Sequence, residues 1–198
     1  MIAHHPRHGF IQHYKNSAGF TLVETVIVVG MSACMMIAIS ALVLNFNKTL
    51  LYGNTSNQSF GSASALMREI ESLTLPANAI LQTHTFGGAT YISTSTSLVL
   101  EIPSIDSSGN VIANTYDYAA FYVVGTTSAY RLLQPNALST RASSTKLLSS
   151  TLNSMTFSFS HTDFTQVSST TVDIQTRAQV KQDIISDHQR ELIRLRNH

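Results

Sequence analysis

The sequence is poor in residues that cross-link or charge a protein. It has one cysteine, no tryptophan and four prolines, and charged residues make up only 12% of its 198 residues. A single cysteine excludes an intrachain disulfide, so any folded domain must be held together by packing alone. The 12 basic side chains nearly balance the 11 acidic ones. No basic run stands out after the N-terminal region, so charge gives no reason to expect a nucleic-acid binder.

Serine and threonine supply most of the polarity instead, as in residues 93–97, 143–151 and 168–171. Such a surface is solvated without being charged, which favours an exported protein. The length allows one domain with an appendage, but not two full domains. Cys34 lies in the most apolar segment, and we expect a small buried hydrophobic residue there rather than a reactive thiol.

A long uncharged segment lies near the N-terminus. Residues 25–47 contain no charged side chain, and residues 25–44 read TVIVVGMSACMMIAISALVL. A membrane-spanning helix needs about 20 apolar residues, each rising about 1.5 Å, so this segment predicts a span. The alternative is a signal peptide cleaved after residues 39–41 (Ile-Ser-Ala). It fits less well because apolar sequence continues through Phe46.

The residues before the span predict its orientation. Arg7 and Lys15 precede it, and basic residues are retained in the cytoplasm. We therefore expect the N-terminus inside the cell and the C-terminal part outside. A metal site in this leader is not predicted, although it contains four histidines: His4, His5, His8 and His13.

The span begins with a specific combination of residues, Lys15-Asn-Ser-Ala-Gly19-Phe20-Thr-Leu-Val-Glu24-Thr. It closely resembles the processing site of type IV prepilins and of the pseudopilins of type II secretion. The resemblance implies that a membrane-embedded prepilin peptidase cuts after Gly19 and methylates the new amino group of Phe20. It also implies that Glu24 takes part in assembly with other pilins or pseudopilins on an inner-membrane platform.

Elementary chemistry gives each of these positions a reason. Glycine lets the backbone adopt an extended, unhindered shape in a peptidase cleft. A carboxylate near the start of a span costs up to a few kcal/mol and is normally paired. Cleavage would create a partner for Glu24, because the amine of Phe20 on a neighbouring subunit is positively charged. In the simpler alternative, Glu24 reaches the interface of an ordinary single-span anchor.

The span departs from many major pilins in one respect. They carry a proline about 22 residues into the mature helix, whereas this chain has Ala41 there and no proline in the span. Gly30 is the only weak point within it. This leaves local melting of the helix in doubt and favours a minor pilin or a pseudopilin.

The helix is predicted to continue beyond the membrane. Within residues 62–73 a helical stripe leaves Arg68, Glu69 and Glu71 to one side, and Pro76 should end the helix. Residues 52–61 have poor helix propensity, with two glycines, and predict a kink or a frayed turn. The stripe consists of Ala63, Leu66, Met67, Ile70 and Leu73.

The remainder is predicted to form short strands separated by turns. Apolar residues alternate with other residues at 98–102 and at 155–159, which predicts strands with one buried face. Residues 106–110 (DSSGN) predict a turn. Gly125 opens a hairpin loop, and Pro135 ends the strand that follows. Further strands are predicted at 116–124, 129–133 and 172–174.

The C-terminal segment 191–198 is ambiguous. Val180, Ile184, His188 and Leu192 could mark a helix face. We favour a strand, because the family that the chain resembles more often ends in one.

The order of these segments resembles the J-type minor pseudopilins and related minor pilins. We therefore expect an α+β, pilin-like fold, in which a long N-terminal helix packs on a small antiparallel β-sheet head. The expected parts are a leader at 1–19, a membrane and assembly half-helix at 20–46, an amphipathic half-helix at 47–75 and an extracytoplasmic head at 76–198.

Other candidate chemistry is weak. Asp106 and its neighbours faintly resemble a calcium loop but lack the downstream glutamate. His161 and Asp163 have no nucleophile elbow or third ligand nearby, so loop residues are preferred. Asn-x-Ser/Thr triplets at 47, 54 and 57 would matter only on a eukaryotic secretory route. Neither a cofactor nor an enzymatic activity is predicted.

Three functions remain open at this point. The first is a minor pilin or pseudopilin in the bacterial inner membrane that joins a filament or its tip. The second is an anchored or pilus-displayed adhesin or binding module, with nucleic acid as partner in the case of a DNA-uptake pilus. The third, an ectodomain enzyme, would need a pocket with convergent polar groups. The sequence does not distinguish secretion, twitching and DNA-uptake machines.

Overall fold

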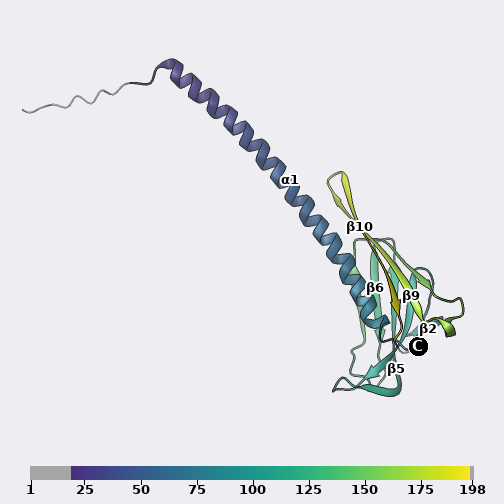
Figure 1. The fold of residues 1–198 in the computed structure, drawn as a ribbon. Helices are drawn as coiled ribbons and strands as arrows, with labels where there is room; N and C mark the ends of the chain where they lie inside the picture. The colour runs from purple at the N-terminus through teal and green to yellow at the C-terminus, as the bar shows by residue number, and fades with distance from the viewer. Residues whose placement is uncertain (1–18, 197–198) are drawn as a thin grey trace, which may run out of the picture. The chain divides into compact units, whose positions relative to one another are not determined.

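The computed structural model describes residues 19–196. Contacts between residues divide the chain into two compact units, Met1–Lys48 and Thr49–His198. The helix α1, Leu22–Thr74, runs through the boundary between them (Figure 1). Arg7, Lys15 and the four N-terminal histidines lie outside the described residues.

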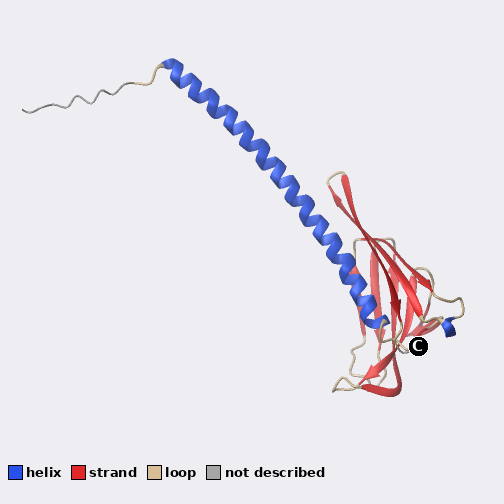
Figure 2. Cartoon of the chain, viewed as in Figure 1, coloured by secondary structure: helices blue, strands red, loops and turns tan. Residues whose placement is uncertain are grey.

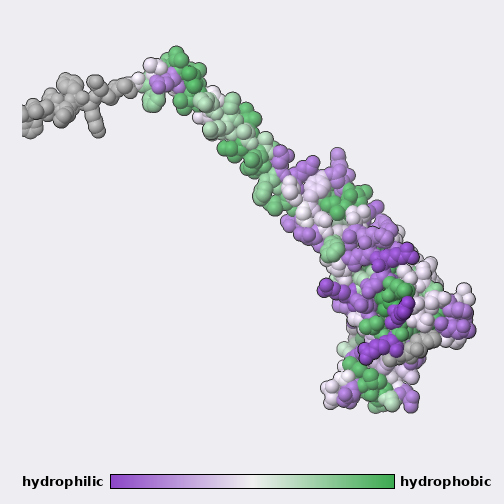
Figure 3. All heavy atoms as spheres, in the orientation of Figure 1, coloured by the Kyte–Doolittle hydropathy of each residue, from purple (hydrophilic) through white to green (hydrophobic). Residues whose placement is uncertain are grey.

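In the first unit α1 is exposed along its whole length. Every residue from 19 to 48 is exposed, and apolar side chains dominate this stretch (Figure 3). The helix is long and apolar enough to cross a membrane. The hydroxyl groups of Ser32 and Ser40 each donate to a backbone carbonyl one turn earlier, at 2.8 and 2.7 Å. These two hydroxyl groups are thus satisfied within the helix, as an apolar environment requires.

Cys34 corrects one expectation. It is exposed on α1 rather than buried, because no other described part of the first unit packs against the helix.

In the second unit the apolar stripe of α1 forms part of the core, as predicted. Ala63, Leu66, Met67 and Ile70 are buried, and Leu73 packs against the same cluster. The helix ends at Thr74, two residues before Pro76. Its last turn is closed by a hydrogen bond from the Leu75 N–H to the Glu71 carbonyl at 2.9 Å.

The predicted frayed turn at 52–61 is wrong, because α1 is helical throughout this segment. Tertiary contacts offset its poor propensity. The hydroxyl groups of Ser59 and Thr176 lie 2.9 Å apart in a buried position, and Ser62 makes a similar contact with Ser149. These contacts fix the helix to two different sheets.

Three antiparallel sheets complete the second unit (Figure 2). The five-stranded sheet has the order β1-β4-β5-β6-β7, the three-stranded sheet the order β10-β9-β8, and β2 pairs with β3. The bounds are β1 Ala79–Ile80, β2 Thr83–Phe86, β3 Ala89–Ile92, β4 Ser97–Ile105, β5 Val111–Val124, β6 Ser128–Gln134, β7 Ser144–Ser149, β8 Leu152–Phe159, β9 Ser169–Val180 and β10 Asp183–Arg194.

One apolar cluster joins α1 to both larger sheets. Its largest fully buried member is Phe121 of β5, and Leu66 and Ile70 of α1 and Ile174 of β9 belong to it. A second, smaller cluster around Phe86 and Val99 lies where the β2–β3 hairpin covers the five-stranded sheet. The chain is therefore α+β: a long N-terminal helix packs on antiparallel sheets.

Most predicted strands are confirmed, including the C-terminal one, β10. The turn at 106–110 is confirmed as well. The Asp106 carboxylate accepts the backbone N–H groups of Ser108 and Asn110 at 2.8 and 2.9 Å, and Gly109 has a φ of +82°, which glycine adopts without strain. The short strands β1, β2, β3 and β7 had no expectation in the sequence.

Candidate functional site at the start of the long helix

Gly19 and Phe20 lie immediately before α1. Phe20 is 79% exposed. A Cβ atom added to Gly19 would meet no other atom within 4 Å, so the folded chain has no steric need for glycine at this position. If glycine is required there, the requirement comes from a partner that acts on the chain.

Glu24 lies in the first turn of α1 and forms a capping box with Thr21. The Thr21 hydroxyl accepts the Glu24 N–H at 3.2 Å, and the Glu24 carboxylate accepts the Thr21 N–H at 3.4 Å. These reciprocal bonds satisfy two of the backbone donors that a helix start leaves unpaired. The position also places a negative charge at the positive end of the helix dipole.

The capping box was missed in the sequence, although its signal is present. Thr21-Leu-Val-Glu24 has the pattern of a hydroxyl residue followed three residues later by glutamate. Glu24 therefore has a role within its own chain, in addition to the assembly role that the resemblance implies. The two roles differ in chemistry, because capping needs an acceptor oxygen whereas pairing with an amine needs a charge.

The most polar buried group in the head is Asp117 of β5. Its carboxylate accepts hydrogen bonds from Ser104, Ser139 and the Asn136 N–H, and pairs with Arg141. Burial alone would raise the pKa of Asp117, but these four donors together lower it below its ordinary value. These donors hold the carboxylate in place and engage both of its oxygens, so its role is structural.

The remaining candidate residues have local structural roles. Asp163 caps the short 3-10 helix Phe164–Gln166 by accepting the Thr165 N–H at 3.0 Å, and the ring Nδ1 of His161 accepts the Asp163 N–H. A groove of about 640 Å³ lies beside them, and His161 is the only titratable residue in its lining. Within residues 19–196 no three His, Cys, Asp or Glu side chains are placed to hold a metal ion.

Comparison of the chain with models of protein families, with curated proteins and with solved structures gave no match.

Proposed function

We propose that this protein is a minor pilin or pseudopilin that is processed after Gly19, N-methylated at Phe20 and assembled through α1 into a type IV pilus-like filament or its tip. The observation that carries the proposal is the position of Gly19, Phe20 and Glu24 at the start of one long helix. The first half of this helix is apolar and exposed, and its second half packs into the core of a β-rich head.

Two structural details support this function. An apolar helix that is exposed on all sides needs lipid or other apolar helices around it, and assembly would supply both in turn. A Cβ atom added to Gly19 would meet no other atom within 4 Å, so a requirement for glycine at this position would come from the peptidase.

The location follows from the same features. The chain would be a single-pass protein of the bacterial inner membrane, with its head outside the cytoplasm. Its partners would be prepilin peptidase, other pilins or pseudopilins, the inner-membrane assembly platform and membrane lipid.

The test is the intact mass and N-terminal sequence of the protein from cells that contain prepilin peptidase. We expect a chain that begins at methylated Phe20, and we expect Gly19→Arg to abolish cleavage. Gly30→Arg is unsuitable as a control because it charges the span, so Gly53→Ala serves instead and should be processed normally. A mature protein that retains Met1 and still assembles would overturn the proposal.

A further inference from the structure

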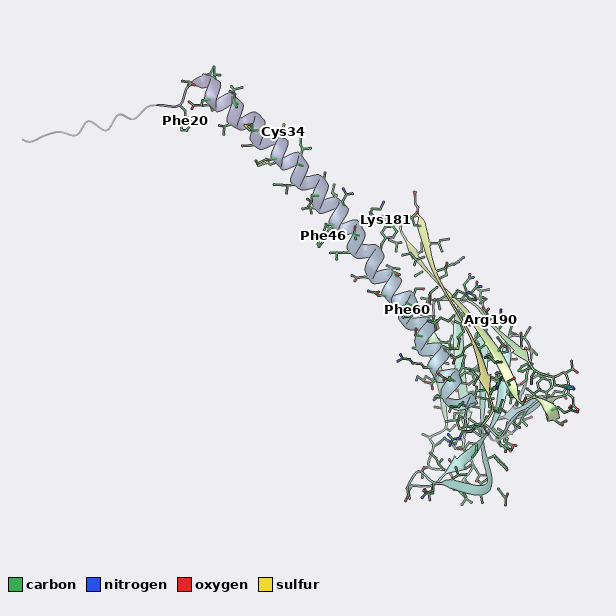
Figure 4. All side chains as sticks on the ribbon, viewed as in Figure 1. Phe20, Cys34, Phe46, Phe60, Lys181 and Arg190 are labelled. Carbon is green, nitrogen blue, oxygen red and sulfur yellow. The ribbon has the colours of Figure 1, made fainter. Side chains whose placement is uncertain are left out.

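The β9–β10 hairpin extends beyond the rest of its sheet. β8 pairs with β9 only as far as Thr176, whereas β9 and β10 stay paired up to Val180 and Asp183. We call residues 178–185 the hairpin tip. Figure 4 shows Lys181 at its turn and Arg190 farther along β10. A two-stranded hairpin alone is marginally stable in water, so the tip needs support from another part of the molecule.

The second half of α1 supplies this support on one face of the hairpin. Three hydrogen bonds join the two elements, and each lies closer to the turn, and closer to the N-terminus of α1, than the one before: Gln189 with Ser64, Thr176 with Ser59, and Asp183 with Tyr52. Val180 of the tip is buried on the same side. The hairpin therefore runs beside α1, with its tip toward the N-terminus of the helix.

The other face of the tip carries an exposed apolar side chain. Ile184 is 61% exposed. It points away from α1, because its neighbour Asp183 contacts α1 and successive side chains of a strand point to opposite faces. Lys181 and Asp183 are the only charged residues of the tip and balance each other. The tip thus offers a partner an apolar contact without net charge.

The position of the tip along α1 identifies this partner. The uncharged stretch of α1 ends before Lys48, and its last apolar residue is Phe46. Tyr52, which holds the tip, lies six residues later, or about 9 Å along the helix. The headgroup layer on each side of a bilayer is about 5–8 Å thick. If the first half of α1 spans a membrane, which is the part of the proposed function on which this inference rests, the tip lies at the level of the headgroups.

We propose that the hairpin tip docks on the outer surface of the membrane, with Ile184 inserted between the lipid headgroups and Lys181 beside their phosphates. One isoleucine binds lipid weakly, but the span already holds the tip at the surface, so its effective concentration there is high. Lys181 has a φ of +55°, which glycine or asparagine adopts more readily, so turn geometry does not explain the lysine. Its long stem lets the amine stay in the headgroup layer.

The test measures the depth of the tip in phosphatidylcholine vesicles that contain a lipid with a nitroxide quencher on its headgroup. The full chain carries Cys34→Ala and one new cysteine, Gln182→Cys at the turn, labelled with a fluorophore. The matched site is Arg190→Cys, exposed on β10 and about 27 Å farther along the hairpin. Retention in the vesicles after carbonate extraction shows that the chain is inserted. We expect quenching at the turn and little at the matched site.

Two serine variants of the chain labelled at residue 182 test which side chain makes the contact. Ile184→Ser should lower the ratio of docked to undocked tip about fivefold, because it removes the partial burial of an isoleucine. Leu192→Ser is the control and should leave this ratio unchanged, since Leu192 is 54% exposed on the same face of β10 but far from the turn.

Three results would overturn the proposal: equal quenching at both sites, no effect of Ile184→Ser, or protection of the tip only at a high ratio of protein to lipid. The last result would mean that a second copy of the chain covers the tip. An inserted chain with an unquenched tip overturns the docking and leaves the pilin-like function standing. A chain that carbonate extracts overturns both.

Discussion

The Nη1 atom of Arg141 lies 2.6 Å from the Oδ2 atom of Asp117. Asp117 is completely buried, whereas the Arg141 side chain is 19% exposed. The pair joins β5 to the segment between β6 and β7, and the Arg141 guanidinium also donates to the Pro103 carbonyl. A carboxylate without side-chain exposure thus holds a long connection against the five-stranded sheet.

Replacement of Asp117 by alanine should destabilise the head strongly. The change leaves the Arg141 guanidinium and three other donors without their acceptor, and loss of one partner of a buried ion pair costs about 3–5 kcal/mol. Urea unfolding of the full chain in detergent measures this free energy. Arg68→Ala, at an exposed position of α1, is the control and should change this free energy by less than about 0.5 kcal/mol. Equal effects of the two changes would contradict the assigned role.

The same carboxylate should make stability depend on pH in acid. The folded pKa of Asp117 lies below its ordinary value of 3.8, so its contribution is complete above that value. This contribution to stability is lost as the pH falls through the folded pKa. The unfolded chain takes up a proton at a higher pH than the folded chain does, so acid favours unfolding. The free energy of unfolding, measured from neutral pH down into this range, should fall more steeply for the original chain than for Asp117→Asn. Parallel curves would show that the carboxylate contributes nothing.

Two glycines, Gly61 in α1 and Gly109 in the turn at 106–110, should respond to alanine in opposite ways. Gly61 is helical, and an added Cβ would meet nothing within 4 Å, so Gly61→Ala should raise the free energy of unfolding by about 0.5–1 kcal/mol. Gly109→Ala adds the same methyl group at a φ of +82° and should lower it, because alanine disfavours this backbone conformation. Thermal unfolding of both variants decides, and destabilisation by Gly61→Ala would mean that the helix needs flexibility there.

Much of this fold could be predicted from local patterns. Alternation predicted β4 and β8, and Pro76 predicted the end of α1, because side-chain period and proline act within a few residues. The continuity of α1 could not be predicted, since it depends on contacts such as Ser59 with Thr176, which are 117 positions apart.

The sequence motif predicted which residues form the candidate site, but it did not predict the hydrogen bonds between them. Gly19, Phe20 and Glu24 were selected from the sequence, and these roles remain predictions. The hydrogen bonds between Thr21 and Glu24 add a competing explanation for the glutamate. An experiment on Glu24 must therefore separate capping from charge.

Glu24→Gln achieves this separation. Glutamine can serve in a capping box as glutamate does, so α1 should begin at the same residue and cleavage after Gly19 should proceed. The variant lacks the negative charge, so it cannot pair with the amine of Phe20 on a neighbouring subunit. We expect its incorporation into filaments to fall at least about tenfold, which corresponds to about 1.4 kcal/mol of lost interaction. The amount of the variant that co-purifies with sheared filaments measures its incorporation.

Two further variants complete this test. Thr21→Ser keeps the hydroxyl group and should assemble normally, whereas Thr21→Val removes the hydroxyl acceptor of the Glu24 N–H but keeps the charge of Glu24. If Thr21→Val impairs assembly and Glu24→Gln does not, then capping of α1 is the function of Glu24, and the ionic contact between subunits is disproved. If Glu24→Gln alone fails, the charge is what the neighbouring subunit recognises, because both variants retain the same apolar helix.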